Sequence, residues 1–127
     1  MGQCIAVVSG KGGTGKTSFT AGVGAALALS GLRVLCVDCD IGLRNLDIAL
    51  GLSDAALMDF SDVAQQRCTL ERAVVSHPQL AKLSLLTAPI RQRGQPVTGE
   101  QMASLLRAVR IQYDFCLLDA PAGLGDG

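Results

Sequence analysis

The sequence predicts an α/β fold built on a parallel sheet with helices on both faces. Short, uninterrupted apolar runs, such as residues 4–8 and 34–37, are typical of strands that are covered on both sides. A helical pattern lies between these two runs, and the order strand, helix, strand makes the two strands parallel. The chain has 127 residues, which fits a single domain.

The composition supports a folded core of aliphatic side chains. Hydrophobic residues make up 49% of the chain, charged residues 17% and aromatic residues 3%, which excludes a disordered protein. Lys and Arg together number 11, as do Asp and Glu, so no overall charge favours nucleic acid or an acidic membrane. Five scattered cysteines indicate reduced thiols and a cytoplasmic protein.

The first helix should begin at Lys16 and end at Gly31. Its inward stripe, at helical spacing, comprises Phe19, Val23, Ala26 and Leu27. The uncharged stretch 17–32 is too short and too rich in Ser, Thr and Gly to span a bilayer. It also follows a strand instead of opening the chain, so we reject a targeting signal.

Two short helices are expected in the middle of the chain, after Asp59 and Thr69, because either side chain can cap a helix N-terminus. Their inward residues would be Phe60, Val63 and Ala64 in the first and Leu70, Ala73 and Val74 in the second. The apolar run 83–86 then predicts a third strand.

The last predicted elements are a longer helix and a fourth strand. Thr98 and Gln101 form a capping box, and the helix behind it has an apolar stripe made of Met102, Leu105, Leu106 and Val109. Residues 115–118 form the strand, which ends at Asp119. A sheet this apolar needs a covering helix after its last strand, and none follows in the sequence. We therefore expect a truncated domain.

The loop after the first strand carries a phosphate-binding motif. The pattern G-x-x-x-x-G-K-[ST] is matched by Gly10, Gly15, Lys16 and Thr17. Glycines let the backbone amides approach phosphates closely, and the following helix directs its positive end at the same anion. Lys16 would neutralise the β- and γ-phosphates of ATP, and the Thr17 hydroxyl would bind Mg²⁺. The predicted loop comprises Gly10, Lys11, Gly12, Gly13, Thr14, Gly15, Lys16 and Thr17.

A dinucleotide-binding site is the main alternative at this loop. Gly10, Gly12 and Gly15 also fit G-x-G-x-x-G, and Asp38 lies about where a ribose-binding acid would be. Such a site has no use for the lysines of the loop or for the Thr that follows Lys16. We therefore favour a P-loop NTPase-type sheet and treat residues 1–127 as the N-terminal part of one such ATPase domain.

Acidic residues end two of the predicted strands. Asp119 would lie in the ligand crevice, where a carboxylate can hold the Mg²⁺ shell; the plainer interpretation is an acid that caps the next turn. Asp38 and Asp40 end the second strand. Asp40 is the better candidate for orienting a water molecule, because it lies further out of the strand, and Asp38 is the more structural of the two.

Cys36 and Cys39 match a redox or metal-binding spacing. Residues three apart in a strand point to opposite faces, and no further Cys pair or His is spaced to complete a metal site. We therefore reject this interpretation.

These motifs resemble a known family. The run 11–17 is similar to the deviant Walker A box of the MinD/ParA ATPases, whose hallmark is an additional lysine, here Lys11. The run 38–47 resembles switch I of the MinD branch, the septum-site-determining ATPases, and the run 119–123 resembles its Walker B motif and the start of switch II. The resemblance covers the whole chain in order.

The resemblance implies a role for each residue. Lys11 would reach the phosphates of a partner subunit's ATP, while Lys16 and Thr17 act within their own subunit. Asp40 would position the hydrolytic water, and Asp119 would serve the magnesium ion. ATP would thereby join two subunits into a homodimer, and hydrolysis would release them.

The implied biology is an ATPase that places the division machinery. It would be cytoplasmic and peripheral at the inner face of the membrane, with the membrane surface and a regulatory protein bound through C-terminal residues that this sequence lacks. Ala120 departs from the Ser usual in the MinD branch, and this bears on hydrogen bonding in switch II.

A partitioning ATPase of the ParA type is the alternative within the family, and it would bind nucleic acid. The candidate contacts are Arg91, Arg93, Arg107 and Arg110, although a solvated face is the plainer interpretation. A dinucleotide-binding oxidoreductase fragment is the alternative of another class.

Overall fold

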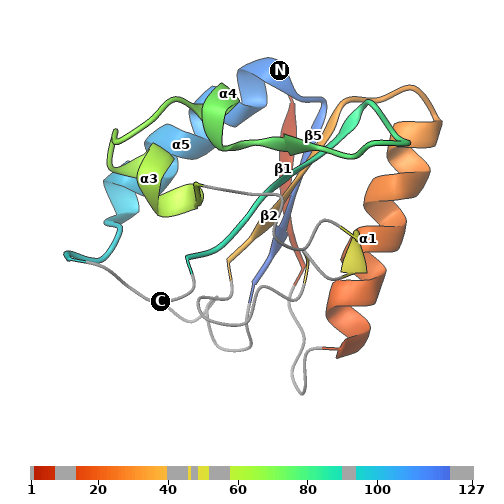
Figure 1. Ribbon diagram of the computed structural model, residues 1–127, viewed down its shortest axis with the longest axis horizontal. Coiled ribbons are helices and arrows are strands. Elements are labelled where there is room, and N and C mark those ends of the chain that lie inside the picture. Colours follow the sequence, from red (N-terminus) through yellow and green to blue (C-terminus); the bar gives the residue numbers. More distant parts are fainter. Residues whose placement is uncertain are drawn as a thin grey trace.

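Strands and helices alternate along the chain (Figure 1). The computed structural model describes residues 2–7, 14–39, 46, 49–51, 58–89 and 94–120. The elements are β1 (Gln3–Val7), α1 (Thr14–Leu29), β2 (Val34–Asp38), α3 (Phe60–Ala64), α4 (Leu70–Ala73), β3 (Val75–Ser76), β4 (Leu83–Leu86), α5 (Gly99–Gln112) and β5 (Phe115–Asp119). The α/β class expected from the sequence is confirmed.

The strands form one sheet in the order β1-β5-β2-β4-β3. The strands β1, β5, β2 and β4 are parallel, and β3 pairs antiparallel with β4 at the edge. The predicted parallel direction of β1 and β2 is confirmed, but the two are separated by β5. The two-residue strand β3 was not predicted, because its apolar content is too small to form a pattern.

Helices cover both faces of the sheet, as predicted. Figure 1 shows α1 on one side and α3, α4 and α5 on the other. The cluster of buried side chains on the α1 side contains Ala21, Ala28, Val34, Cys36, Leu46, Leu50, Leu83, Leu85 and Leu117. The opposite cluster contains Leu35, Val37, Phe60, Ala64, Leu70, Ala73, Leu86, Ala88, Leu105, Val109 and Cys116. Successive residues of β2 alternate between the two clusters, so this strand is buried on both faces.

The strand β1 differs from the prediction because it is not covered on both faces. It lies at the edge of the sheet, and the Ile5 side chain is 42% exposed. The helix α1 packs over β2, β5 and β4 instead. An apolar run therefore identified the strand correctly but did not reveal its edge position.

The inward face of α1 was predicted only in part: Val23 and Leu27 pack against the cluster on this side, but the other two predicted residues do not. Phe19 is 61% exposed and Ala26 is also exposed, whereas the buried positions are Thr20, Ala21, Gly24 and Ala28. This face consists of small residues, which let the helix axis approach the sheet closely. A Cβ atom added to Gly24 would lie 2.9 Å from the Sγ atom of Cys36. Within the described part of the chain, no helix has the length and apolar character needed to cross a membrane.

Capping side chains fix the starts of α3 and α5, as predicted. The Asp59 carboxylate accepts hydrogen bonds from the amides of Ser61 and Asp62 at 2.9 and 3.2 Å, and the Asp62 carboxylate accepts one from the Asp59 amide at 3.0 Å. Thr98 and Gln101 form the same reciprocal box in α5. Thr69 precedes α4 but makes no capping hydrogen bond with its side chain, so that part of the prediction was wrong.

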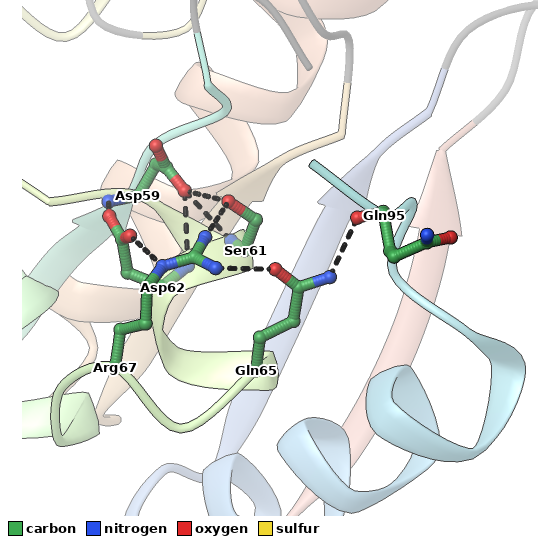
Figure 2. A network of polar contacts seen from close by, with 6 residues as sticks. All are labelled: Asp59, Ser61, Asp62, Gln65, Arg67 and Gln95. Carbon is green, nitrogen blue, oxygen red and sulfur yellow. Dashed lines mark hydrogen bonds and ion pairs between the residues drawn. The ribbon is translucent and has the colours of Figure 1, made fainter. Parts of the chain in front are cut away.

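A polar network joins α3 to its surroundings (Figure 2). The Arg67 guanidinium donates to Asp62 Oδ1 at 2.9 Å and to Gln65 Oε1 at 2.7 Å. The Gln65 amide then donates to the carbonyl of Gln95 at 2.9 Å. The Phe60 amide donates to the carbonyl of Thr87, just after β4, at 2.8 Å. The last of these contacts holds the start of α3 against the carboxyl end of β4.

Candidate nucleotide-binding site

The predicted phosphate loop connects β1 to α1. The strand β1 ends at Val7, and α1 begins at Thr14, two residues before the predicted start, so Lys16 and Thr17 belong to its first turn. This turn contains no acidic residue. The positive end of a 16-residue helix is therefore not neutralised by its own side chains, which favours an anion there. Gly10, Lys11, Gly12 and Gly13 lie outside the residues that the structure describes.

Asp119 lies at the carboxyl end of the sheet, next to the start of this loop. It is the last residue of β5, and its register partners are Val7 in β1 and Asp38 in β2. Adjacent strands are about 4.8 Å apart, so the Asp119 backbone is one strand spacing from the residue that enters the loop. Its side chain is 1% exposed. The following amide, of Ala120, donates to the Val7 carbonyl at 3.1 Å.

Asp38 is the second buried acid at this edge, with no exposed surface. Its Oδ2 atom accepts a hydrogen bond from the amide of Leu46 at 3.3 Å. Asp40, the candidate water-positioning residue, lies outside the described residues. The site therefore combines two buried carboxylates on neighbouring strands with the first turn of α1.

Cys36 and Cys39 point to opposite faces of the sheet, as strand geometry predicts. Cys36 is buried in the cluster beneath α1, whereas Cys39 packs against the cluster on the other face. All five cysteines are free thiols. Within the described ranges, no group of three or more Cys, His, Asp or Glu side chains could hold a metal ion.

The pKa of the Cys36 thiol is affected by its burial and by the charge of Asp119. Burial, and after it the negative charge of Asp119, raise the pKa of the Cys36 thiol above its ordinary value, to about 12. Protonated Cys36 is therefore favoured by the fold. As the pH rises above about 9, the unfolded chain releases this proton while the folded chain keeps it, so stability is lost between about 9 and about 12.

We expect the free energy of unfolding to fall more steeply above pH 9 in the unmodified protein than in Cys36→Ala. The difference in slope should approach about 1.4 kcal/mol per pH unit, the value for one proton. Urea unfolding at a series of pH values measures it. Because Cys68 and Cys116 also have raised pKa values, both proteins should lose some stability. Parallel curves for the two proteins above pH 9 would contradict the prediction.

The strand order argues against a dinucleotide-binding site. In the common dinucleotide-binding sheet the first strand pairs directly with the second, in the order 3-2-1-4-5-6. Here β5 lies between β1 and β2 and brings Asp119 to the strand that leads into the loop. An acid adjacent to the phosphate loop is the arrangement that a Mg²⁺-dependent NTPase requires.

Comparison with known proteins agrees with this geometry. Residues 5–117 match the family described as the CobQ/CobB/MinD/ParA nucleotide binding domain. The chain belongs to this family. Curated relatives of this MinD/ParA-family chain include the septum site-determining protein MinD of Synechocystis sp., which is 42% identical over 127 residues, and that of Bacillus subtilis, 40% identical over 129. Each alignment covers all of this chain and 48% of the relative, so the chain spans about half the length of the curated relatives it matches.

Solved structures of MinD share the fold of this MinD/ParA-family chain. The MinC:MinD cell division protein complex of Aquifex aeolicus has a TM-score of 0.85 and 38% identity, covering 98% of this chain and 50% of the other. MinD of Pyrococcus horikoshii OT3, complexed with Mg-ADP, has a TM-score of 0.75 and 34% identity over 98% and 51% of the two chains. The resemblance to the MinD/ParA family and the P-loop NTPase-type sheet are thereby confirmed.

Some contacts at the site of this MinD/ParA-family chain were not anticipated from the sequence. Leu46 was not singled out, although its amide binds Asp38 and its side chain is fully buried. Among the arginines considered for nucleic acid, Arg91 and Arg93 lie outside the described residues, and Arg110 donates to the Gly2 carbonyl at 2.9 Å.

Proposed function

We propose that this chain provides the ATP-binding and hydrolysing site of a MinD-type switch ATPase that places the cell-division machinery. The observation that carries the proposal is the meeting of β1, β5 and β2 at one edge. There Asp119 lies beside the strand that leads into the Walker A loop, and Asp38 lies beside Asp119 on the next strand; the last residues of that loop form the first turn of α1. This edge is where open α/β sheets bind their ligands.

The residues at this edge suit ATP with Mg²⁺. Mg²⁺ prefers oxygen ligands and uses one or two protein groups together with phosphate oxygens and water. The Thr17 hydroxyl and the Asp119 carboxylate would supply them. When bound, the ion neutralises charge that develops on the phosphates. Lys16 and the first amides of α1 would hold the phosphate chain, and Asp40 would orient the attacking water. The similar MinD of Pyrococcus horikoshii was solved with Mg-ADP, which supports this assignment.

We further propose that ATP joins two full-length copies into a homodimer, with Lys11 of each subunit reaching the phosphates bound to the other. The similar Aquifex aeolicus protein forms a complex with MinC, which supports a regulatory protein as a partner. The curated relatives named above are septum site-determining proteins, which favours division over chromosome partitioning.

Isothermal titration with ATP–Mg²⁺ and with NAD tests the nucleotide class. We expect ATP–Mg²⁺ to bind and NAD not to bind. The variant Lys16→Ala should lower the ATP affinity at least about tenfold, because it removes a charged partner of the phosphates. Lys82→Ala is the matched control, since the Lys82 ammonium donates to the Gly31 carbonyl at 2.9 Å, far along the chain from the loop. Binding of NAD alone, or equal effects of both lysine variants, would overturn the proposal.

A further inference from the structure

Two cysteines lie side by side on adjacent strands of the sheet. Cys4 in β1 and Cys116 in β5 are register partners. Both side chains lie on the α5 side of the sheet, where Cys116 is a buried member of the cluster and Cys4 packs against it. The Cys116 thiol is hydrogen-bonded to the Cys4 thiol. Adjacent parallel strands are about 4.8 Å apart, and a disulfide spans Cα separations of about 4.4–6.8 Å. The backbone therefore already holds this pair at a distance that suits a disulfide.

The remaining cysteines are placed less favourably for a disulfide. Cys36 lies in the cluster on the α1 side of the sheet, and Cys39 points to the opposite face. Cys39 also lies four residues beyond the β2 register partner of Cys116, which corresponds to roughly 13 Å along the strand. Cys68 lies on the connection between α3 and α4, outside the sheet. The geometry therefore singles out the pair formed by Cys4 and Cys116.

The two thiols of this pair differ in their access to solvent. Cys4 is half-buried in the edge strand β1, whereas Cys116 is 1% exposed. Burial, and after it the neighbouring Cys4 thiol, raise the pKa of Cys116 above its ordinary value. The thiolate is the attacking species in thiol–disulfide exchange, so a reagent in solution should react first with Cys4. Cys116 then has to reach only its neighbour.

We propose that Cys4 and Cys116 form a redox-sensitive dithiol, which a small disulfide such as oxidised glutathione converts to an intramolecular disulfide that locks β1 to β5. The Cys4 thiolate attacks one sulfur of the small disulfide, so a mixed disulfide forms and one small thiol leaves. Cys116 then attacks the Cys4 sulfur and releases the second small thiol. The protein dithiol gives up two electrons and two protons, which the small disulfide gains as it becomes two thiols.

This modification site is separate from the nucleotide site and does not rest on the proposed function. A metal is a poorer match for the pair, because structural zinc takes four ligands. Among the residues that the structure describes, no group of three or more Cys, His, Asp or Glu side chains could hold a metal ion. Redox chemistry needs the two thiols alone.

The disulfide would join residues that lie far apart in the sequence. More than 100 residues separate Cys4 from Cys116, so the cross-link strongly restricts the unfolded chain. Oxidation should therefore raise the midpoint of urea unfolding by about 1 M or more. Treatment with dithiothreitol should return the midpoint to its original value.

Peptide mapping after incubation with oxidised glutathione tests the site, once free thiols have been alkylated. Trypsin cleaves after Lys11 and Arg110, which places Cys4 in the peptide 1–11 and Cys116 in the peptide 111–127. We expect the unmodified protein to yield these two peptides joined by a disulfide. Cys68→Ser is the matched control, since Cys68 is also half-buried but lies outside the sheet, and it should yield the same joined peptides.

Two further variants separate the steps of the exchange. Cys116→Ala should stop at the mixed disulfide between Cys4 and glutathione. In Cys4→Ser, the remaining Cys116 should react with oxidised glutathione at least about tenfold more slowly than Cys4 does in Cys116→Ala, because it is buried. The proposal is wrong if the unmodified protein yields no joined peptides, or if full linkage leaves the urea midpoint unchanged. Equal reaction rates in the two variants would also contradict it.

Discussion

Replacing Gly24 by Ala should lower the free energy of unfolding by about 1–3 kcal/mol and weaken ATP binding. The added Cβ would lie 2.9 Å from Cys36 Sγ and 3.2 Å from Leu83 Cδ1. Both neighbours are fully buried, so neither can move aside without disturbing the sheet. The helix would be pushed outward instead, and its first turn, which carries Lys16, would move relative to Asp119. Urea unfolding and ATP titration measure the two effects.

Gly22 supplies a matched control for this variant. It lies in the same helix, it is exposed, and an added Cβ would have no atom within 4 Å. Gly22→Ala should therefore stabilise the protein by about 0.5–1 kcal/mol, since Ala is the better helix former. The double variant Gly24→Ala/Cys36→Ala should lose less stability than the sum of its single variants, because the closest contact is removed. Equal effects of Gly22→Ala and Gly24→Ala would show that helix–sheet contact does not limit this position.

Asp40→Ala should leave ATP binding intact and reduce hydrolysis about 100-fold or more, because the attacking water loses the group that orients it. The affinity for ATP–Mg²⁺ should remain within about threefold of the original, since Lys16 and the α1 amides hold the phosphates. Single-turnover hydrolysis and equilibrium titration measure these quantities separately. Normal turnover in Asp40→Ala would refute the assigned role.

The oligomeric state gives this prediction a second readout. In a full-length version of the protein, Asp40→Ala should accumulate ATP-bound dimers. The two subunits would still associate when ATP binds, but without hydrolysis they would not separate. Lys11→Ala is the matched control, since it should bind ATP and remain monomeric. Size-exclusion chromatography with and without ATP distinguishes the two. An unchanged elution volume for both variants would contradict the proposed dimer.

The parts of the fold that depend on local pattern were predictable. The apolar runs located β2, β4 and β5 to within one residue. Asp59 was identified as the cap of α3, and the capping box of α5 was identified from Thr98 and Gln101. The motif G-x-x-x-x-G-K-[ST] placed the turn between β1 and α1 because glycines and a helix start are needed at fixed offsets. Asp119 could be identified because it directly follows an apolar run.

The parts that depend on distant contacts were not predictable in the same way. The inward face of α1 was misjudged in part because the prediction followed the helical spacing of apolar residues. The position closest to Cys36 and Leu83 is occupied by Gly24, which has no apolar side chain to mark it. The strand β5 lies between β1 and β2 because it pairs with both, although it is far from them in the sequence. The spacing of apolar residues along the chain does not indicate which strands pair. The contact between Asp38 and Leu46 joins residues eight apart in the sequence, which no helical or strand periodicity predicts.

The central place of β5 has a consequence for biosynthesis. Gln3 and Phe115 are register partners although more than 100 residues separate them, and β2 also pairs with β5. On a ribosome that adds about 5–20 residues per second, β1 therefore waits for several seconds before its neighbour emerges. During that interval β1 and the facing edge of β2 are unpaired, a state prone to aggregation. The nascent chain should thus depend on chaperones until β5 has been translated.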